Sequence, residues 1–314
     1  MPPSNVQYHV EPTPAVSSTN VFRDELFVGK VVFCTGGSSG ICKAIVAALM
    51  RHGASAFIVG RNADKARIAA SELTCNSGRT CGYHPADVRT PDNIKEAVRR
   101  CIGMFGKIDF VVCGAAGNFL STIDNLSENG FKTVIEIDTL GTFNTVKATL
   151  PYVRESRGAY LHISATLHYR GTPYQAHVSA AKAGVDALSA VLAVEEGPRG
   201  VRSNVIAPGP IAETEGYSRL STGSEETIRA SQSRYPLGRA GDLRDVSNAA
   251  IWLFSPAANW ITGQVLAVDG GEYHVTSGMV PDYPQNVLDP DSMKGLIKNT
   301  KGVRSTLVPQ GSKL

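Results

Sequence analysis

The sequence has no apolar run long enough to cross a membrane and no dense block of one charge. A spanning helix needs about 18 consecutive apolar residues, and here 31 basic and 28 acidic side chains leave a formal net charge of +3. Residues 1–20 show no basic stretch followed by an apolar core, so we expect no secretory signal. We therefore expect neither a membrane nor a nucleic acid as partner, although basic side chains remain for small anions.

The six cysteines also lack the spacing of a metal site or of a redox pair. None lies in a C-x-x-C motif, and no histidine cluster accompanies them. Several fall in apolar segments such as Val31–Cys34. We expect buried free thiols and no bound metal.

What the sequence does contain, from Lys30 onward, is an alternation of short β-branched runs with helical stretches. Continuous apolar strands in such an alternation predict an α/β fold in a single domain, a doubly wound Rossmann-type parallel sheet with helices on both faces. Strands are expected at Val31–Thr35, Ala56–Gly60, Gly82–Asp87, Phe110–Gly114, Tyr160–Ser164, Arg202–Ala207 and Val265–Asp269, and helices at Ile41–His52, Ala63–Leu73, Asp92–Phe105, Glu128–Tyr152 and Val178–Glu196.

The two ends of the chain differ from this pattern. Residues 1–25 are rich in Pro, Ser and Thr, which predicts a tail or wrapping arm before a domain at 26–275. Residues 276–314 have weak periodicity and are expected to form an extension. The chain ends in Ser312-Lys313-Leu314, a tripeptide that an import receptor reads as a peroxisomal address. This ending predicts a location in the peroxisomal matrix.

A glycine-rich loop lies between the first predicted strand and the first predicted helix. In Thr35–Ile41, Gly36 permits a tight turn and Gly40 allows a pyrophosphate to approach the backbone. The helix that follows offers unpaired N–H groups and the positive end of its dipole. The loop therefore predicts a dinucleotide site, the alternative being a glycine turn that binds nothing.

The residue after the second strand indicates which dinucleotide binds. Sites specific for NAD usually have an acid there, but this chain has Gly60-Arg61-Asn62. The guanidinium of Arg61 suits a 2′-phosphate, so NADPH is the expected cofactor unless Arg61 is simply solvated. Asp87, after the third strand, either faces the adenine or caps the helix that begins near Pro91.

Taken together, the motifs resemble the short-chain dehydrogenase/reductase family over about residues 28–272. The resemblance rests on Thr35-Gly36-x3-Gly40-Ile41, on Gly114–Gly117, on Lys182 and on Pro208-Gly209. It implies a cofactor site made of Gly36, Ser38, Ser39, Gly40, Ile41, Arg61, Asp87, Val88, Ala115, Lys182, Pro208, Gly209 and Ile211.

The catalytic positions depart from the family's usual pattern. Val178 stands where the family has its Tyr, and Ala165, beside Ser164, stands where it has its Ser. Asp138 replaces the usual Asn, and Cys42 replaces the third glycine of the loop. Without the Tyr, carbonyl reduction loses the acid that protonates an alkoxide. Either the chain is an inactive nucleotide-binding member of the family, or its chemistry does not produce an alcohol.

The second alternative fits a subgroup of the family. Asp138, Gln175–Lys182, Ala207–Ile211 and Thr214–Gly216 resemble the peroxisomal 2,4-dienoyl-CoA reductases, particularly the fungal ones. The resemblance implies hydride addition at the far end of a 2,4-dienoyl-CoA and protonation at the alpha carbon, giving a trans-3-enoyl-CoA. A reductase of another acyl-CoA, or of a carbonyl substrate, is the alternative enzyme.

The resemblance also implies roles for individual residues. Lys182 would hold the nicotinamide ribose, and Asp138 would supply a proton through a water. Burial would raise the pKa of Asp138 and the Lys182 charge would lower it, and the sequence leaves this balance open. Reserve proton donors are His177, Tyr169, Tyr174 and Asp269.

The acyl-CoA substrate and a homotetramer complete the expected partners. Arg61, Arg89 and Arg219 would contact the phosphates or the adenine end of the substrate. The acyl-thioester passage would be lined by Phe119, Ser127 and Asn129. The long helices expected at Glu128–Tyr152 and Val178–Glu196 carry more apolar surface than one sheet face needs, which indicates that they pair across two-fold axes in a tetramer.

Overall fold

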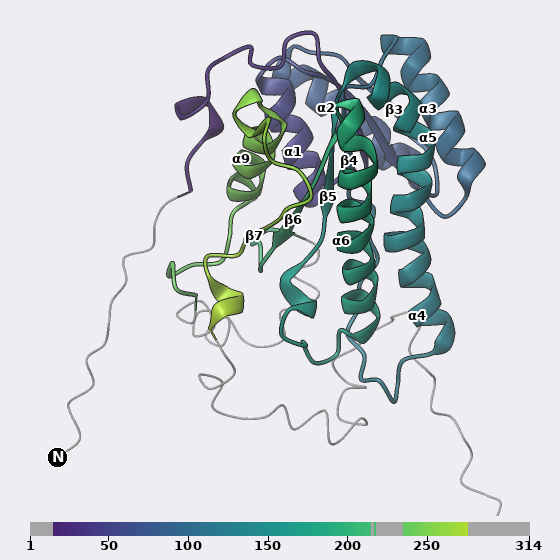
Figure 1. Ribbon diagram of the computed structural model, residues 1–314, viewed down its shortest axis with the longest axis vertical. Helices are drawn as coiled ribbons and strands as arrows, with labels where there is room; N and C mark the ends of the chain where they lie inside the picture. Colours follow the sequence, from purple (N-terminus) through teal and green to yellow (C-terminus); the bar gives the residue numbers. More distant parts are fainter. Residues whose placement is uncertain (1–14, 215–216, 218–234, 276–314) are drawn as a thin grey trace, which may run out of the picture.

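The computed structural model describes residues 15–214, 217 and 235–275 (Figure 1). In this part of the chain seven strands form one parallel sheet in the order β3-β2-β1-β4-β5-β6-β7. The order reverses between β1 and β4, and a ligand crevice is expected at such a point, outside the carboxyl ends of the strands. The strands are β1 Val31–Thr35, β2 Ser55–Gly60, β3 Cys81–Pro85, β4 Phe110–Cys113, β5 Ala159–Ile163, β6 Arg202–Pro208 and β7 Val265–Val268.

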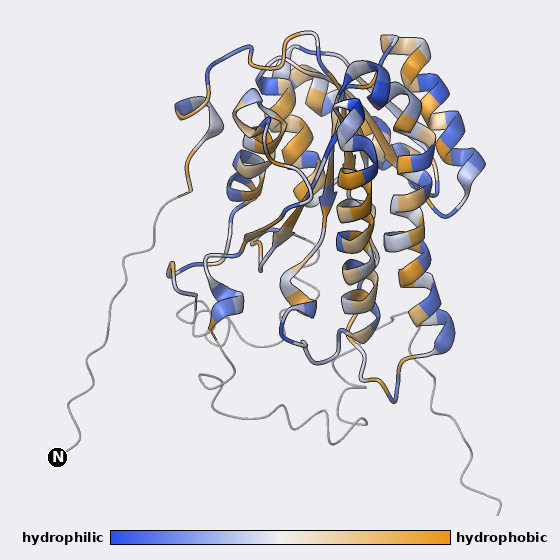
Figure 2. Ribbon diagram, in the orientation of Figure 1, coloured by the Kyte–Doolittle hydropathy of each residue, from blue (hydrophilic) through white to orange (hydrophobic). Residues whose placement is uncertain are grey.

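Helices cover both faces of the sheet, which confirms the predicted doubly wound fold (Figure 1). One apolar core joins the sheet to α1 Gly40–Arg51, α2 Ala63–Ser77 and α9 Leu243–Phe254. The core on the other face includes α3 Pro91–Phe105, α5 Gly141–Ser156 and α6 Ala176–Glu196. Hydropathy colouring shows the central strands and much of α6 as apolar (Figure 2). The central strands are mostly apolar because both of their faces are buried.

The helical stretch expected at Glu128–Tyr152 is present, but it contains a π-helical turn that the sequence did not predict. It consists of α4 Glu128–Ile135, a π-helical turn at Glu136–Leu140, and α5. Gly141 lies so close to Val88 that a Cβ at Gly141 would stand 2.5 Å from the Val88 Cγ2. The Thr142 hydroxyl donates to the Asp138 carbonyl at 2.6 Å. The close approach of Gly141 to Val88 and the Thr142 hydrogen bond thus stabilise the π-helical turn. Turns of this kind are often found at functional sites.

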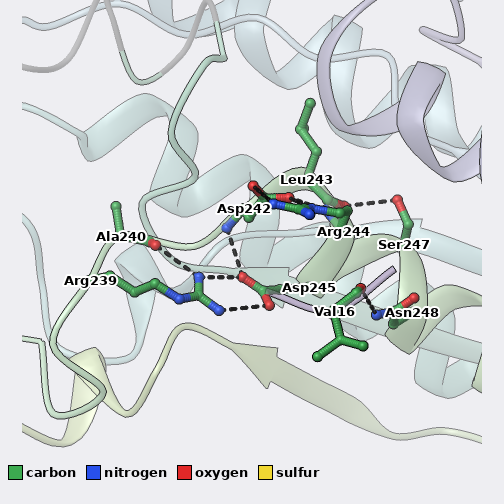
Figure 3. Close-up of polar contacts among 9 residues, drawn as sticks. All are labelled: Val16, Arg239, Ala240, Asp242, Leu243, Arg244, Asp245, Ser247 and Asn248. Atoms are coloured by element: carbon green, nitrogen blue, oxygen red, sulfur yellow. Dashed lines mark hydrogen bonds and ion pairs between the residues drawn. The ribbon is translucent and has the colours of Figure 1, made fainter. Parts of the chain in front are cut away.

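The helix α9 was absent from the sequence-based expectations, although its start carries a recognisable capping signal. The Asp242 carboxylate accepts from the Arg244 N–H at 2.8 Å, and the Asp245 carboxylate accepts from the Asp242 N–H at 2.7 Å (Figure 3). This reciprocal capping satisfies N–H groups that a helix start leaves unpaired. Arg239 pairs with Asp245 at 2.6 Å and fixes the chain that enters the helix (Figure 3).

The described part of the N-terminal arm packs on the domain. The Asn248 side chain of α9 donates to the Val16 carbonyl at 2.9 Å (Figure 3). His52 follows α1 and is bound on both ring nitrogens, to Ser18 Oγ at 3.0 Å and to the Arg23 carbonyl oxygen at 3.1 Å. The predicted extension at 276–314, with its terminal tripeptide, lies outside the described residues.

One segment, Ala176–Arg199, is long and apolar enough by length and composition to cross a bilayer. It contains α6, which packs on the sheet through buried residues such as Val185 and Leu192. Packing inside the domain accounts for its apolar composition, as it does for the core helix of any globular protein.

Candidate active site

A cavity of about 1520 Å³ opens at the carboxyl ends of the strands, where the strand order reverses. Its walls come from the loops that follow β1, β2, β3, β4, β5 and β6 and from the start of α6. Every residue that the sequence assigned to the cofactor lies on this wall: Gly36, Ser38, Ser39, Gly40, Ile41, Arg61, Asp87, Val88, Ala115, Lys182, Pro208, Gly209 and Ile211.

The glycine-rich loop is shaped for close backbone approach. Gly36 has φ +74°, and a Cβ there would lie 2.7 Å from the Gly114 carbonyl oxygen at the end of β4. Ser39 precedes α1 in an extended conformation and gives no side-chain cap to its first turn. The N–H groups of that turn are therefore available, with the positive end of the helix dipole, to an anionic group in the cavity.

At the end of the cavity formed by the loops after β2 and β3, Asp87 has an ion-pair partner and Arg61 has none among the described residues. Arg89 binds Asp87 through two guanidinium nitrogens, Nε at 3.0 Å from Oδ1 and Nη2 at 2.6 Å from Oδ2. This hydrogen bonding lowers the pKa of Asp87. Thr90, not Asp87, occupies the N-cap position of α3, so the capping alternative for Asp87 is wrong. Arg61 is exposed on the same wall and forms no hydrogen bond or ion pair with a described residue.

The π-helical turn brings Asp138 to Lys182 of α6. Asp138 is fully buried, and its Oδ2 lies 2.9 Å from the Lys182 Nζ. Lys182 also donates to the Ile163 carbonyl oxygen at 2.9 Å, and Asp138 Oδ1 accepts from the Gly117 N–H at 2.8 Å. Burial raises the pKa of Asp138, against the opposing charge of Lys182. Burial therefore wins the balance that the sequence left open, and the carboxyl holds its proton to a higher pH.

Lys182 and Asp138 do not reach the cavity equally. Lys182 lines the wall, whereas Asp138 lies behind it. Val178, at the family's Tyr position, also lines the wall and is packed with Val134 and Ala181. A proton from Asp138 must therefore pass through the Lys182 ammonium or a water to reach a ligand.

Three residues of this wall carry buried polar atoms that have no hydrogen-bond partner among the described residues. Asn118 Oδ1, Ser164 Oγ and Gln175 Oε1 are buried, belong to wall residues, and have no hydrogen-bond partner among the described residues. Buried polar atoms are costly unless something binds them. The Ser164 hydroxyl is a donor that an oxyanion could use. The sequence placed Ser164 beside a catalytic position but gave it no role.

Of the residues predicted to bind substrate, Arg61 lies on the described wall, and Arg89, Phe119, Ser127 and Asn129 do not. Phe119 packs against the His177 ring at 4.2 Å between centroids. Ser127 caps α4 by accepting from the Gly130 N–H at 3.0 Å, Asn129 is exposed on α4, and Arg89 is engaged by Asp87. Arg219 lies outside the described residues. The sequence missed Arg170, which lines the cavity and pairs with Glu272.

Three of the four reserve donors are held by other contacts or are buried away from the wall, and Tyr174 alone among them lies on it. His177 is buried, and burial lowers its pKa. The Tyr169 hydroxyl donates to Asp186 at 3.1 Å, and Asp269 accepts from two backbone N–H groups, each at 2.9 Å. Tyr174 lines the cavity. Among the described residues no three His, Cys, Asp or Glu side chains gather as a metal site requires.

Comparison with known proteins supports the resemblance to the short-chain dehydrogenase/reductase family. Residues 36–273 match the family model described as enoyl-(acyl carrier protein) reductase. The chain is 47% identical to a peroxisomal 2,4-dienoyl-CoA reductase of Saccharomyces cerevisiae over 81% of this chain and 87% of that protein. It is 46% identical to the peroxisomal 2,4-dienoyl-CoA reductase of Danio rerio, over 81% and 85%. A short-chain type dehydrogenase/reductase from Mycobacterium ulcerans superposes with a TM-score of 0.76 at 30% identity, covering 86% of this chain and 99% of that one.

Proposed function

Because the chain belongs to the short-chain dehydrogenase/reductase family, we propose from its altered catalytic positions that it reduces 2,4-dienoyl-CoA thioesters to trans-3-enoyl-CoA with NADPH. The observation that carries the proposal is the buried Asp138–Lys182 pair beside Val178. Relatives at 47% and 46% identity are named for this activity.

The cavity fits a dinucleotide phosphate. Its first turn of α1, its glycine loop and Lys182 would hold the pyrophosphate and the ribose. Arg61 would bind a 2′-phosphate, since it has no acid partner among the described residues. When bound, NADPH supplies the hydride.

The protein's own groups account for the rest of the reaction. Hydride addition at the far end of the diene moves electrons into the thioester carbonyl, giving a dienolate. The Ser164 hydroxyl, buried on the wall and without a protein partner, would donate to that oxygen. The Lys182 ammonium would protonate the alpha carbon, and the buried Asp138 carboxyl would return the proton to Lys182 across 2.9 Å.

Such a site has no need of the family's Tyr. A Tyr hydroxyl protonates an alkoxide, and dienoyl reduction forms none. Val178 instead leaves an apolar surface, continuous with Val134 and Ala181, beside the reacting chain. The altered positions therefore favour reduction of a conjugated thioester over reduction of a ketone.

The decisive experiment is a spectrophotometric assay with the full-length protein. We expect the dienoyl-CoA absorbance and the NADPH absorbance to fall together, with 3-enoyl-CoA as product. Turnover of a 3-ketoacyl-CoA or a simple ketone instead would establish the carbonyl reductase alternative. NADPH binding without turnover of any of these substrates would establish the inactive alternative.

The assembly and location follow from surfaces and from the chain's end. Large apolar side chains are exposed on the helices expected to pair, including Phe143 of α5 at 45% and Val194 of α6 at 78%. We propose a homotetramer, which light scattering tests directly against the 33.3 kDa of one chain. We also propose import into the peroxisomal matrix through Ser312-Lys313-Leu314, a tripeptide that an import receptor reads. Deletion of this tripeptide should leave the activity intact and the protein in the cytosol of cells.

A further inference from the structure

A second cavity lies at the opposite edge of the sheet from the active site. Its volume is about 570 Å³, a size typical of small-molecule sites. Phe110, Ala159 and Arg202, the first residues of β4, β5 and β6, lie on its wall, so this cavity opens at the amino ends of the strands. It shares no described residue with the wall of the active cavity, and the proposed reduction makes no use of it.

The buried part of this second wall is aromatic. Phe27, Phe110 and Phe254 all lie on the wall, and each is at most 6% exposed. The Phe110 ring contacts both of the others, with its centroid 5.6 Å from that of Phe27 and 4.6 Å from that of Phe254. Trp260 also lies on the wall and is fully exposed, although tryptophan is largely buried in most proteins. The second cavity therefore offers apolar surface to the body of a ligand.

The charged residues on the second wall are all basic. They are Lys30, Arg157 and Arg202, and no Asp or Glu is among the described residues of this wall. Lys30 is balanced by the buried Asp109, whose Oδ1 lies 3.0 Å from the Lys30 Nζ and which also pairs with Lys107. Arg157 and Arg202 form no ion pair with a described residue. Two guanidinium groups without a carboxylate favour an anionic ligand.

Arg202 is the more deeply placed of these two cations. It is half-buried, and among the described residues its guanidinium has one hydrogen bond, from Nη1 to the Ile261 carbonyl oxygen at 3.4 Å. The same burial lowers the pKa of Arg202. A buried charge without a counter-ion is costly, so an anion bound beside Arg202 would be stabilising.

Arg157 is held at the second cavity by an unusual backbone conformation. It ends α5 with φ 49° and ψ 48°, in the left-handed region where the chain after a helix usually has glycine. A Cβ at Gly200, which is also on the wall, would stand 3.5 Å from the Cβ, Cγ and Cδ of Arg157. The aliphatic part of the Arg157 side chain therefore lies along Gly200. A long cation thus occupies a position at which the backbone favours glycine, and such positions cluster at ligand sites.

We propose that the second cavity binds a free aliphatic carboxylate, with its chain against the three phenylalanines and its carboxylate on the guanidinium groups of Arg157 and Arg202. A guanidinium binds a carboxylate through two parallel N–H donors, which suits this head group. An aliphatic chain gains free energy by leaving water for the phenylalanine surface. The proposal goes beyond the reductase activity and does not depend on it.

The test measures the binding of decanoate to the full-length protein by calorimetry, in the presence of saturating NADPH. Decanoate should bind at least tenfold more tightly than acetate, which lacks the chain. It should also bind at least tenfold more tightly than decylammonium, which has the chain and the opposite charge. A decanoate analogue that carries a photoreactive diazirine should label peptides containing Arg157, Arg202 or Trp260, as mass spectrometry would show.

Variants of the two cations make the result specific. Arg157→Gly removes the guanidinium at a position whose backbone favours glycine, so the Tm should not fall while the Kd for decanoate rises at least tenfold. Arg157→Lys should restore part of the affinity. Arg202→Gln keeps a donor for the Ile261 carbonyl oxygen and should also weaken binding at least tenfold. Arg67→Ala, which removes an exposed arginine paired with Asp64 on α2, is the control and should leave the affinity unchanged.

Several results would overturn the proposal. Failure of decanoate to bind, or equal binding of decanoate and decylammonium, would show that the second cavity is not a carboxylate site. Unchanged decanoate affinity in Arg157→Gly and Arg202→Gln, or labelling confined to the walls of the active cavity, would place the ligand elsewhere. Dienoyl-CoA turnover should be the same in Arg157→Gly as in the unsubstituted protein. Decanoate binding without any dienoyl-CoA turnover would overturn the proposed function and leave the carboxylate site standing.

Discussion

Two acid–base pairs join α6 to the helical segment that precedes β5, and the pKa values of their acids shift in opposite directions. In Asp138–Lys182 the acid lies on the π-helical turn and the cation on α6, whereas in Arg154–Glu196 the cation lies on α5 and the acid on α6. Both acids are nearly or fully buried. Yet the pKa of Asp138 is raised by burial, while hydrogen bonds from Arg154 lower the pKa of Glu196.

The pKa directions differ because burial outweighs the charge of Lys182 at Asp138, whereas the hydrogen bonds from Arg154 outweigh burial at Glu196. Arg154 binds both oxygens of Glu196, at 2.7 and 2.5 Å, and Arg199 adds a second guanidinium at 3.5 Å. Lys182 is a single ammonium that also serves the Ile163 carbonyl oxygen. A planar fork stabilises the ionised acid better than a shared point charge. The same pair of helical segments thus holds one acid whose pKa is lowered and one whose pKa is raised.

Removing the transferable proton of Asp138 should have the largest effect on kcat. Asp138→Asn keeps the size of the side chain but loses the transferable proton, so we expect kcat to fall by about 10²–10⁴-fold with NADPH affinity little changed. Lys182→Ala should reduce both kcat and NADPH affinity, because Lys182 lines the cavity. Steady-state kinetics and separate binding measurements distinguish these outcomes.

A second substitution sharpens this result. Val178→Tyr should not rescue the Asp138→Asn protein, since its hydroxyl would serve an alkoxide that this substrate does not form. Near-normal kcat in Asp138→Asn would contradict the assignment and direct attention to His177 or Asp269.

Arg61 extends the comparison to a cation with no acid partner among the described residues. Arg61→Ala should raise the KM for NADPH far more than that for NADH. A charge-assisted phosphate contact contributes roughly 1.5–3 kcal/mol, or about one to two powers of ten. Lys65→Ala is a useful companion, because Lys65 lines the same end of the cavity. Equal effects of Arg61→Ala on the two cofactors would remove Arg61 from cofactor selection.

The opposite pKa directions predict opposite responses to pH. The raised pKa of Asp138 means that the carboxyl keeps its proton to a higher pH than an ordinary aspartate, so kcat should fall by up to about tenfold per pH unit once pH exceeds that raised pKa. The lowered pKa of Glu196 means that its stabilisation is complete above a carboxyl's usual range and is lost as pH falls through the lowered value. A kcat profile that stays flat across the alkaline range would exclude Asp138 as the proton source.

Breaking the second pair should affect stability and leave catalysis alone. Arg154→Ala leaves Glu196 with Arg199 only, and we expect the Tm to fall by about 2–4 °C with kcat unchanged. Arg99→Ala is the matched control, because Arg99 pairs with Glu96 on the exposed side of α3 and exposed pairs contribute little. A loss of activity in Arg154→Ala at temperatures well below its Tm would show that the two pairs are coupled.

Local signals explain which parts of the molecule the sequence could predict. The strands and the cofactor loop were predictable because apolar runs and glycines determine the backbone conformation of the few residues around them. The strand β1, for example, has the predicted bounds. The predicted substrate residues stay a prediction, and the sequence missed Arg170 because its place on the wall involves a contact with Glu272, far along the chain. The missed α9 did have a local signal, in Asp242 and Asp245.

The π-helical turn has a consequence for the phase of the helix that contains it. A turn that holds one extra residue rotates everything after it by about 100° relative to an uninterrupted α-helix. The apolar stripes of α4 and α5 are therefore offset, which is why one 3.6-residue period cannot describe residues 128–152. The extra residue of the π-helical turn thus determines the direction in which Asp138 points. Deleting one residue within Glu136–Leu140 would bring the stripes into phase and carry Asp138 away from Lys182, a loss that no scan of single substitutions would reveal.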